Sequence, residues 1–413
     1  MVSFRARAMD PLHVLKTKPR RLVAGLMSGT SADGIDCAIC SIEGGGPARD
    51  PRDGAPRPPA RVKLEAFRGH PYDASLRRRI LGIAGAQVRE IAALHAEIGD
   101  AFAEACLRTL VLAGIPEEAL DLVGSHGQTI YHHNGTEPRV TLQIGDGDRI
   151  AEKLGTVVVS DFRARDVAAG GEGAPLTPYA DLVLLASAAE GGRRPVVLNL
   201  GGIANVTILD PDPRRIAAFD TGPANAPLDR LARLVTGGEW NCDFGGKLAS
   251  EGRVVPALLE DLLRDPFLAR KPPKSTGTEA YGDAFVARLV ARHGRADRDL
   301  LATATAFVAR SIAAALRDHT PAGPPISEVI AAGGGTLNPT LLTQLKEALA
   351  PIPVVLSDER GIPSKAREAM AFAILGNDAL LGLPTNLPQA TGAARHVTLG
   401  KMSFPPSQTR LGS

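Results

Sequence analysis

Hydrophobic residues occur in short runs separated by glycine-rich polar turns, and this pattern predicts alternating strands and helices. In the first half of the chain, strands are predicted at residues 21–26, 35–42, 62–67, 120–124, 141–144 and 156–160. A long helix is predicted at 88–113, where apolar residues recur at helical spacing, and a short one at 148–154. A turn is predicted at 125–129. These elements indicate a mixed α/β protein.

The same pattern restarts near residue 195. A strand at 195–200, a glycine turn and a return strand at 205–209 resemble the opening at 21–42. The offset is roughly 170 residues, about the length of one domain. Later strands are predicted at 216–219, 328–332 and 353–356, and later helices at 227–234, in much of 254–317, at 339–350 and at 365–380. Two similar openings predict two related domains facing each other, with ligands expected in the cleft between them.

The length of 413 residues also favours more than one domain. We expect a basic extension without structure at 1–20 and a first domain at 21–192, with an exposed flexible loop at 44–60. We expect a second domain at 193–413. Its C-terminal segment could pack against the first domain.

Charge and composition narrow the class of protein. The net charge is +2 and aromatic residues make up 4% of the chain, which argues against a nucleic-acid partner. There is no apolar run of about 20 residues and no apolar stretch typical of a secretory signal, so we expect no membrane association and a cytoplasmic location. Cys37 and Cys40 fall in a predicted strand and point to opposite faces, which favours two separate thiols over a shared site.

Two glycine loops between strands are candidates for phosphate binding. In the loop at 27–36, glycines let backbone N–H groups approach a phosphate, and Ser28, Thr30 and Ser31 add hydroxyl donors. Asp33 and Asp36 offer oxygen ligands suited to Mg²⁺. The loop at 199–205 is similar, and together the two could clamp one polyphosphate from opposite domains. The alternative for each loop is an ordinary hairpin turn.

Two further turns carry candidate chemistry. Asp220 follows an apolar strand and precedes a helix, which places a carboxylate at a strand end, although it could simply cap the turn. Gly333, Gly334 and Gly335 follow a buried strand and leave a flat surface for a planar ring, while Asn338 could cap the next helix. Neither a Walker A pattern nor G-x-G-x-x-G after a strand occurs, so phosphate binding would use hairpin loops.

The histidines do not form a pattern typical of a metal site. The segment 124–128 is too rich in glycine for a helix, and the adjacent His132 and His133 point apart in a strand. His126 and Gln128 are better suited to a polar wall for sugar hydroxyls.

Several long motifs resemble one family. They are Gly-Leu-Met-Ser-Gly-Thr-Ser-Ala-Asp-Gly-Ile-Asp at 25–36, Gly-Ser-His-Gly-Gln-Thr at 124–129, Asp-Phe-Arg-Ala-Arg-Asp-Val-Ala-Ala-Gly-Gly at 161–171, Gly-Ala-Pro-Leu at 173–176, Asn-Leu-Gly-Gly-Ile-Ala-Asn at 199–205, Phe-Asp-Thr-Gly-Pro-Ala-Asn at 219–225, Pro-Pro-Lys-Ser-Thr-Gly at 272–277, Gly-Gly-Gly at 333–335 and Glu-Ala-Met-Ala-Phe-Ala at 368–373. In this order, over about residues 21–400, the chain resembles the anhydro-N-acetylmuramic acid kinases.

The resemblance implies the actin-like ATPase (ribonuclease H-like) fold of hexokinases, with two duplicated domains around a nucleotide cleft, and a homodimer in bacterial cell-wall recycling. It implies ATP and Mg²⁺ as cofactors and a small sugar as the substrate. In the implied reaction, ATP phosphorylates O6 of 1,6-anhydro-N-acetylmuramic acid while water opens the anhydro bridge at C1. The products are N-acetylmuramic acid 6-phosphate and ADP.

Site residues follow from these loops and from the resemblance. The catalytic residues would be Asp220, as the base for the attacking water, and Glu368, assisting at the sugar. The ATP site would comprise Gly29, Thr30, Ser31, Ala32, Asp33, Gly34, Ile35, Asp36, Gly201, Gly202, Asn205, Gly333, Gly334, Gly335 and Asn338, with Asp33 and Asp36 toward the metal, directly or through water. The sugar site would comprise His126, Gln128, Thr129, Asp161, Gly173 and Pro175.

Two positions depart from the family pattern near the expected sugar site. Glu172 stands where the family usually has Gln, and Asp181 where it often has His. Both add negative charge that would repel the lactyl carboxylate of a muramic acid. One alternative is therefore a kinase for another amino sugar. Two further alternatives are a non-enzymatic actin-like ATP-binding protein and a hydrolase using His126 and a carboxylate. No nucleophile motif is present for the hydrolase.

Overall fold

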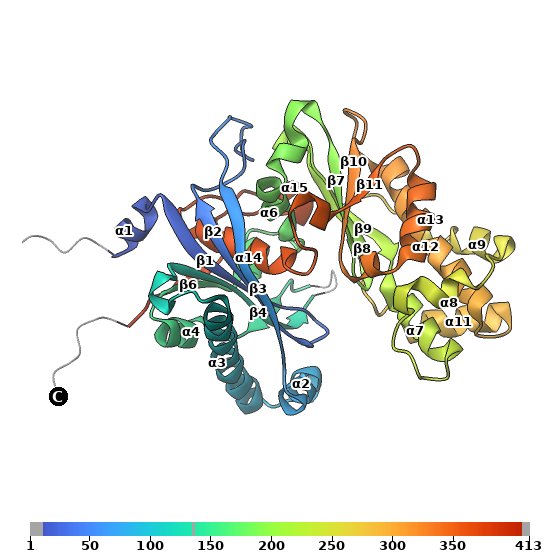
Figure 1. The fold of residues 1–413 in the computed structure, drawn as a ribbon, viewed down its shortest axis with the longest axis horizontal. Coiled ribbons are helices and arrows are strands. Elements are labelled where there is room, and N and C mark those ends of the chain that lie inside the picture. The colour runs from blue at the N-terminus through green and yellow to red at the C-terminus, as the bar shows by residue number, and fades with distance from the viewer. Residues whose placement is uncertain (1–10, 134–136, 407–413) are drawn as a thin grey trace, which may run out of the picture. The chain divides into compact units, whose positions relative to one another are not determined.

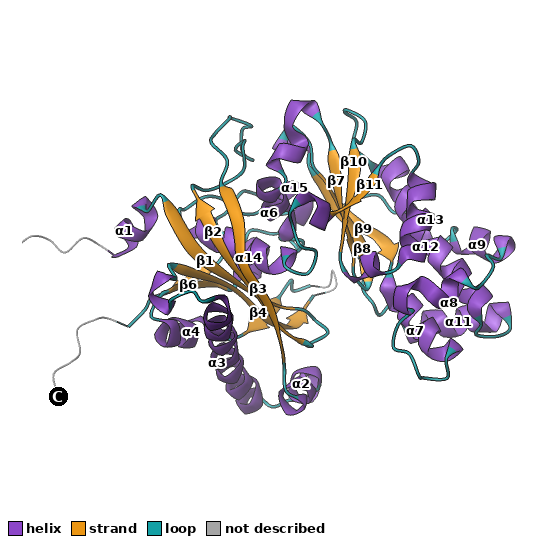
Figure 2. Ribbon diagram, in the orientation of Figure 1, coloured by secondary structure: helices purple, strands orange, loops and turns teal. Residues whose placement is uncertain are grey.

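The computed structural model describes residues 11–133 and 137–406. The chain divides into two compact units, one formed by Met1–Leu184 with Ala366–Ser413 and the other by Leu185–Lys365. Each unit contains its own sheet with helices packed against it, as the ribbon shows (Figure 1). The secondary structure is mixed throughout (Figure 2), which confirms the predicted α/β class.

The sheet of the first unit has the strand order β12-β6-β4-β1-β2-β3, with β5 paired to β4. Its strands are β1 (Arg20–Ser28), β2 (Gly34–Glu43), β3 (Arg61–Pro71), β4 (Leu122–His132), β5 (Thr141–Ile144), β6 (Val157–Ser160) and β12 (Lys401–Ser403). Strands β1, β2 and β3 are antiparallel neighbours, whereas β4 and β6 run parallel to β1.

Two helices cover opposite faces of this sheet. Helix α3 (Val88–Ala113) buries Leu94 and Phe102 in a cluster that includes Ala24 of β1. The next residue, Gly25, points to the other face, where α14 (Arg367–Leu380) packs directly on the strand backbone. A Cβ on Gly25 would lie 1.8 Å from the carbonyl oxygen of Ala369, so the helix can approach this closely only over glycine.

The remaining helices of the first unit are short. They are α1 (Pro11–Thr17), α2 (Ala74–Leu81), α4 (Gly147–Leu154), α5 (Phe162–Ala168), α6 (Thr177–Leu184) and α15 (Pro388–Thr391).

The sheet of the second unit has the order β11-β10-β7-β8-β9. Its strands are β7 (Pro195–Leu200), β8 (Ile203–Ile208), β9 (Ala217–Pro223), β10 (Glu328–Ala332) and β11 (Val354–Leu356). Its helices are α7 (Asn225–Val235), α8 (Lys247–Ser250), α9 (Pro256–Leu262), α10 (Pro266–Ala269), α11 (Asp283–His293), α12 (Arg298–His319) and α13 (Pro339–Leu349). Among the described residues, α12 alone is long and apolar enough to span a membrane, and 78% of that apolar window is buried.

The two sheets share one topology. In each, the first three strands form an antiparallel meander, and the next two core strands add on the other side of the first strand and parallel to it. The order is therefore 3-2-1-4-5 in both units, which confirms the predicted duplication. The carboxyl ends of the parallel strands are the sheet edge at which such folds bind ligands.

Three local predictions differ from the structure. Residues 11–17 form helix α1 instead of an unstructured extension, and residues 1–10 lie outside the described residues. The loop at 44–60 is folded, because Asp50 pairs with Arg52 and Arg57 and an isolated bridge joins Arg49 to Pro56. Residues 125–129 continue β4 instead of forming a turn, since Gly127, with φ +75°, allows the strand to change register without ending.

Candidate active site

The expected site residues gather at the carboxyl ends of the parallel strands in each unit. In the first unit, Gly29 follows β1, Gln128 lies on β4 and Asp161 follows β6. In the second, Gly201 follows β7 and Gly333 follows β10. This is the edge at which open α/β sheets place their ligand sites.

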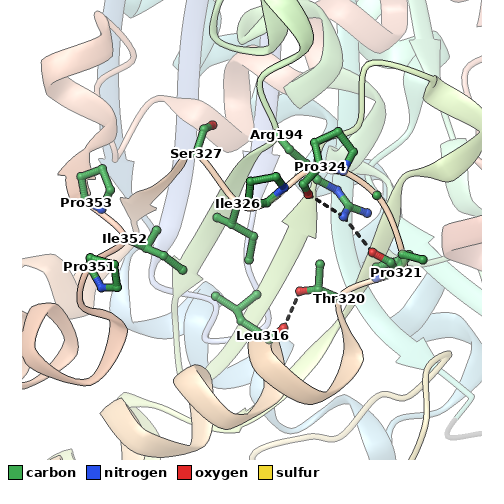
Figure 3. Close-up of a pocket in the computed structure, with 13 residues that line it drawn as sticks. Arg194, Leu316, Thr320, Pro321, Pro324, Ile326, Ser327, Pro351, Ile352 and Pro353 are labelled. Atoms are coloured by element: carbon green, nitrogen blue, oxygen red, sulfur yellow. Dashed lines mark hydrogen bonds between the residues drawn. The ribbon is translucent and has the colours of Figure 1, made fainter.

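A cavity of about 550 Å³ in the second unit lies at the opposite edge. Its lining includes Arg194, Ser327 and Pro353, which immediately precede β7, β10 and β11, respectively (Figure 3). Arg194 donates to the carbonyl oxygens of Pro321 and Pro324, and Asp210 balances its charge. The rest of the wall is largely proline and aliphatic, so this cavity offers no chemistry for the expected reaction.

The loop after β1 is held by its own backbone. Ala32 adopts φ +50°, is fully buried, and donates its N–H to Gly29 O at 3.1 Å. The Asp33 side chain is 72% exposed and pairs with Arg77 at 3.0 Å. A Cβ on Gly29 would meet only the Ser31 hydroxyl, at 3.9 Å, so the loop backbone borders open space that a phosphate could occupy. Asp36 lies within β2, opposite Met27.

Gln128 on β4 is hydrogen-bonded to the backbone of this loop. Its side chain is completely buried: Oε1 lies 2.7 Å from the Ser28 hydroxyl, and Nε2 donates to the carbonyls of Gly29 and Thr129 at 3.0 and 3.2 Å. The Ser28 hydroxyl is buried as well, and lies 2.7 Å from Gly34 O. Both side chains were expected to face a ligand. Their polar atoms instead join β1 to β4 and fix the backbone at Gly29 and Gly34.

His126 has a similar supporting position. Its Nδ1 lies 3.0 Å from Gly127 O, and its Nε2 lies 3.0 Å from Nε of Arg163. An arginine can only donate, so Nε2 accepts and Nδ1 carries the proton. Burial, and secondarily the charge of Arg163, lowers the pKa of His126 well below its usual value. The ring packs on Phe372 of α14 at 4.6 Å between centroids. His126 is therefore a neutral acceptor that orients Arg163.

Arg163 connects this histidine to the segment at 170–175. Its Nη1 donates to Gly173 O at 2.8 Å, while Asp166 accepts from Gly173 N at 2.9 Å. Asp161, at φ +53°, begins α5 and is paired with Lys401. Thr129 accepts from Gln143, and Pro175 follows a cis peptide bond. The structure thus brings His126 and Gly173 together through Arg163, whose role the sequence analysis did not recognise.

The two unusual acidic residues are balanced by cations. Asp181 is buried and forms a bidentate pair with Arg367 at the start of α14. Glu172 lies 3.3 Å from Arg139. Because Arg367 neutralises the charge of Asp181, repulsion of a substrate carboxylate by Asp181 is no longer expected. Glu368, the next residue on α14, is partly exposed, and its charge acts on Arg163.

Asp220 lies in the middle of β9 (Ala217–Pro223), not after the strand as predicted, and a separate segment of the second unit holds it there. Its backbone N–H donates to Lys274 O at 3.1 Å, and Thr276 N–H donates to its Oδ2 at 2.8 Å. Burial raises the pKa of Asp220 to about 6, against the lowering effect of the Thr276 N–H and the Lys274 charge. Within the described residues, Oδ1 accepts no hydrogen bond. The carboxyl group is thus oriented through one oxygen, with the other left to act on a ligand.

The two glycine turns of the second unit meet at Asn225. Its N–H donates to Gly201 O and its Nδ2 to Leu200 O, each at 3.0 Å. A Cβ on Gly335 would lie 3.1 Å from Asn225 Oδ1, so the second turn touches the same side chain. Asn205 on β8 lies directly opposite Asp220. Asn338 accepts the N–H of Leu341 at 2.9 Å and is buried, which is the helix-capping role and not that of an exposed ATP ligand.

The sequence analysis did not identify Arg163, Arg367, Lys274 and Thr276, which contact the expected site residues or the acidic residues near them. The motifs at 161–166 and 272–277 contained three of them. Their positions in long unusual motifs were a signal, but nothing in the linear pattern said which partner each would meet.

Comparisons with known proteins agree with one another. The sequence model described as anhydro-N-acetylmuramic acid kinase matches residues 21–405. A protein of that name from Caldanaerobacter subterraneus subsp. tengcongensis is 40% identical over 410 residues, covering 96% of this chain and 100% of the relative. Another, from Gloeobacter violaceus, is 42% identical, covering 92% of this chain and 97% of the relative.

Among solved structures, a ROK hexokinase from Thermus thermophilus is 14% identical, with a TM-score of 0.32 and coverage of 86% of this chain and 97% of that one. That likeness is too distant to bear on function. The family model and the full-length relatives, by contrast, cover nearly all of the chain, including every loop described above. The chain belongs to the anhydro-N-acetylmuramic acid kinase family.

Proposed function

We propose that this protein converts 1,6-anhydro-N-acetylmuramic acid, water and ATP to N-acetylmuramic acid 6-phosphate and ADP. The observation that carries the proposal is the position of Asp220. Its carboxyl group is oriented by the Thr276 N–H, leaves Oδ1 without a protein donor among the described residues, and has its pKa raised by burial to about 6. A carboxylate with a pKa close to neutral is suited to general-base catalysis.

The chemistry balances as follows. Asp220 takes a proton from water, and the water oxygen forms a bond to C1 of the anhydro sugar. The bond between C1 and O6 breaks, and O6 takes the electron pair. O6 then attacks the γ-phosphorus of ATP, and the bond from that phosphorus to the β,γ-bridging oxygen breaks to release ADP. The proton on Asp220 passes to solvent, so the net reaction consumes one water and releases one proton.

For ATP, we assign the phosphates to the loop at Gly29–Asp33 and to the turn at Gly201–Gly202, and the nucleoside to Gly333–Gly335. Open space beside Gly29 supports the assignment of the phosphates, and the assignment of the nucleoside follows from the family resemblance. Mg²⁺ is typically bound by one or two carboxylates together with substrate phosphates and water, and the exposed Asp33 fits that role, with Asp36 as the second candidate. Bound there, the ion would neutralise charge on the transferring phosphoryl group.

For the sugar, we assign direct contacts to Thr129, Asp161, Gly173, Pro175 and Glu368. His126 and Gln128 act through other groups: the former orients Arg163 and the latter holds the phosphate loop. Because Asp181 is neutralised by Arg367, a substrate carboxylate remains compatible with this unit.

An ADP-release assay with MgATP tests the function. It would compare 1,6-anhydro-N-acetylmuramic acid with N-acetylmuramic acid and N-acetylglucosamine. We expect activity on the anhydro sugar alone. Activity only on an open sugar would remove the ring-opening role of Asp220, and no activity on any of the three would contradict the kinase assignment. Sedimentation with ATP would then detect the polymers of a non-enzymatic actin-like protein.

We also propose a cytoplasmic homodimer, from the family resemblance. Analytical ultracentrifugation of the full chain at several concentrations tests the dimer, and cell fractionation tests the location. A monomer throughout, or recovery in the membrane fraction, would contradict the respective proposal.

A further inference from the structure

Residues 270–277 form a strap that is hydrogen-bonded to Asp220 in the middle of β9. This strap, from Arg270 to Gly277, follows the short helix α10 and has no regular secondary structure. It makes both hydrogen bonds that position Asp220: the carbonyl of Lys274 accepts the Asp220 N–H, and the N–H of Thr276 binds Oδ2. The geometry of the proposed base therefore depends on what holds the strap in place.

The Lys274 side chain anchors the strap. It is only 4% exposed, and its ammonium group donates to the carbonyl oxygens of Leu268 at 3.0 Å and Phe267 at 3.4 Å. These carbonyls lie in α10 and have further partners, because Phe267 O also accepts the N–H of Arg270 and Leu268 O also lies 3.1 Å from Nε2 of His319. The ammonium also lies over the ring of Phe267, 4.9 Å from its centroid, and 5.9 Å from that of Phe219, the residue before Asp220.

A buried ammonium is costly, since burial lowers the pKa of Lys274. An apolar side chain could fill the same space between two phenylalanines, so anchoring alone does not require a charge there. The nearby charges are Asp220 and Asp318, which favour the ammonium, and Arg270, which opposes it. His319 of α12 contacts Leu268 O and the Phe219 ring, and Asn205, opposite Asp220 on β8, is neutral.

We propose that Lys274 is a positioning residue for the general base: it anchors the strap that orients Asp220, and its buried ammonium places a positive charge over the ring of Phe219, the residue before Asp220. The inference rests on the proposed role of Asp220. It adds that a charge from a segment more than 50 residues away in sequence lowers the pKa of this carboxyl group, against the larger opposing effect of burial.

The first test is the pH profile of kcat between pH 5 and 9 for Lys274→Met, Lys274→Gln and Lys274→Arg. Loss of the charge should move the acidic limb upward by about half a unit to one unit in both the Met and Gln variants. The Arg variant should keep the limb of the wild type. The control is Lys271→Met, on the same strap but exposed, which should leave the profile unchanged. An acidic limb common to the wild type, Met and Gln enzymes would overturn the proposal.

The second test does not depend on activity. Thermal unfolding of the wild type, Asp220→Asn, Lys274→Met and the double variant, at pH 5 and pH 8, forms a double-mutant cycle. We expect a coupling between the two positions at pH 8 that weakens at pH 5, where Asp220 is largely protonated. The same coupling at both pH values would mean a purely structural lysine and would overturn the proposal. This outcome remains distinct from failure of the proposed function, which the sugar assay reports.

Discussion

Arg367 and Asp181 form a bidentate ion pair inside the first unit, with Nε to Oδ1 at 2.9 Å and Nη2 to Oδ2 at 2.5 Å. Their side chains are 5% and 1% exposed. The pair joins α6 to the first turn of α14, directly beside Glu368. An acidic residue that the sequence placed near the expected sugar site is therefore committed to an ion pair inside the unit.

Asp181→Asn should destabilise the protein by about 3–5 kcal/mol, because it leaves the Arg367 charge buried without a partner. Urea unfolding measures this change. The control is Asp100→Asn, which breaks an exposed pair with Arg149 and should cost less than about 1 kcal/mol. Unchanged stability together with a lower KM for the sugar would instead mean that Asp181 repels the substrate.

Gly124→Ala should displace α14, since a Cβ at this position would lie 2.0 Å from the carbonyl oxygen of Phe372. Backbone cannot yield as a side chain can, so we expect a loss of about 1–3 kcal/mol or more in the free energy of unfolding. Activity should fall as Glu368 moves with the helix. Gly85→Ala, with no atom within 4 Å, is the control. Equal behaviour of the two variants would contradict the close packing of α14 on β4.

Asp220→Asn should lose turnover by a hundredfold or more, roughly the contribution of a general base. The amide can still accept the Thr276 N–H, so the strap and ATP binding should be preserved. Steady-state kinetics and calorimetric titration with ATP measure the two effects. The control is Asp212→Asn, a partly exposed carboxylate paired with Arg214. Near-normal turnover in Asp220→Asn would refute the assignment of the base.

The same variant should be more stable than the wild type at neutral pH. Burial raises the pKa of Asp220 to about 6 from an ordinary 3.8, so the folded state favours the protonated carboxyl. Its stabilising contribution is complete below about pH 4 and is lost as the pH rises through about 6. Asp220→Asn should therefore gain about 2–3 kcal/mol at pH 8, and the gain should vanish near pH 4.

Unfolding curves across this pH range measure that difference. A constant difference would mean that the carboxyl does not titrate in the folded protein with a raised pKa. Consistently, the acidic limb of the wild-type kcat profile is expected near pH 6.

His126→Phe should raise the KM for the sugar about tenfold, because Arg163 loses the acceptor that orients it while the contact with Phe372 is kept. The KM for ATP should change little. Kinetics with each substrate varied in turn separates these effects. If kcat alone fell, with a lost titration near pH 6.5, the imidazole would be acting in proton transfer and the neutral, positioning role would be wrong.

The sequence anticipated elements whose cause is local. Helix α3 has the bounds that its apolar spacing predicts, and strand β7 ends at Leu200, directly before the predicted glycine turn. It failed where long-range contacts decide. The loop at 44–60 was expected to be exposed because it is rich in proline and glycine. Gly46 N–H, however, binds Asp378, 332 residues away, and that contact anchors the loop.

For the site, the motifs located the correct loops but not the partner of each side chain. Gln128 and His126 were expected to touch the sugar because their polar groups suit hydroxyls. The structure commits those groups to Gly29 O and to Arg163. A buried polar atom must find a partner, and which one is available depends on the neighbouring strands and helices.

By itself, the sequence determined the α/β class, the duplicated opening of strand, glycine turn and strand, and the family, because these depend on residue order and local periodicity. Only the tertiary structure decided that Asp181 is neutralised by Arg367, 186 residues away, and that the Lys274 ammonium lies over the ring of Phe219, the residue before Asp220. Such pairs form where separate segments are buried together, and the low polarity of that interior requires each buried charge to have a partner.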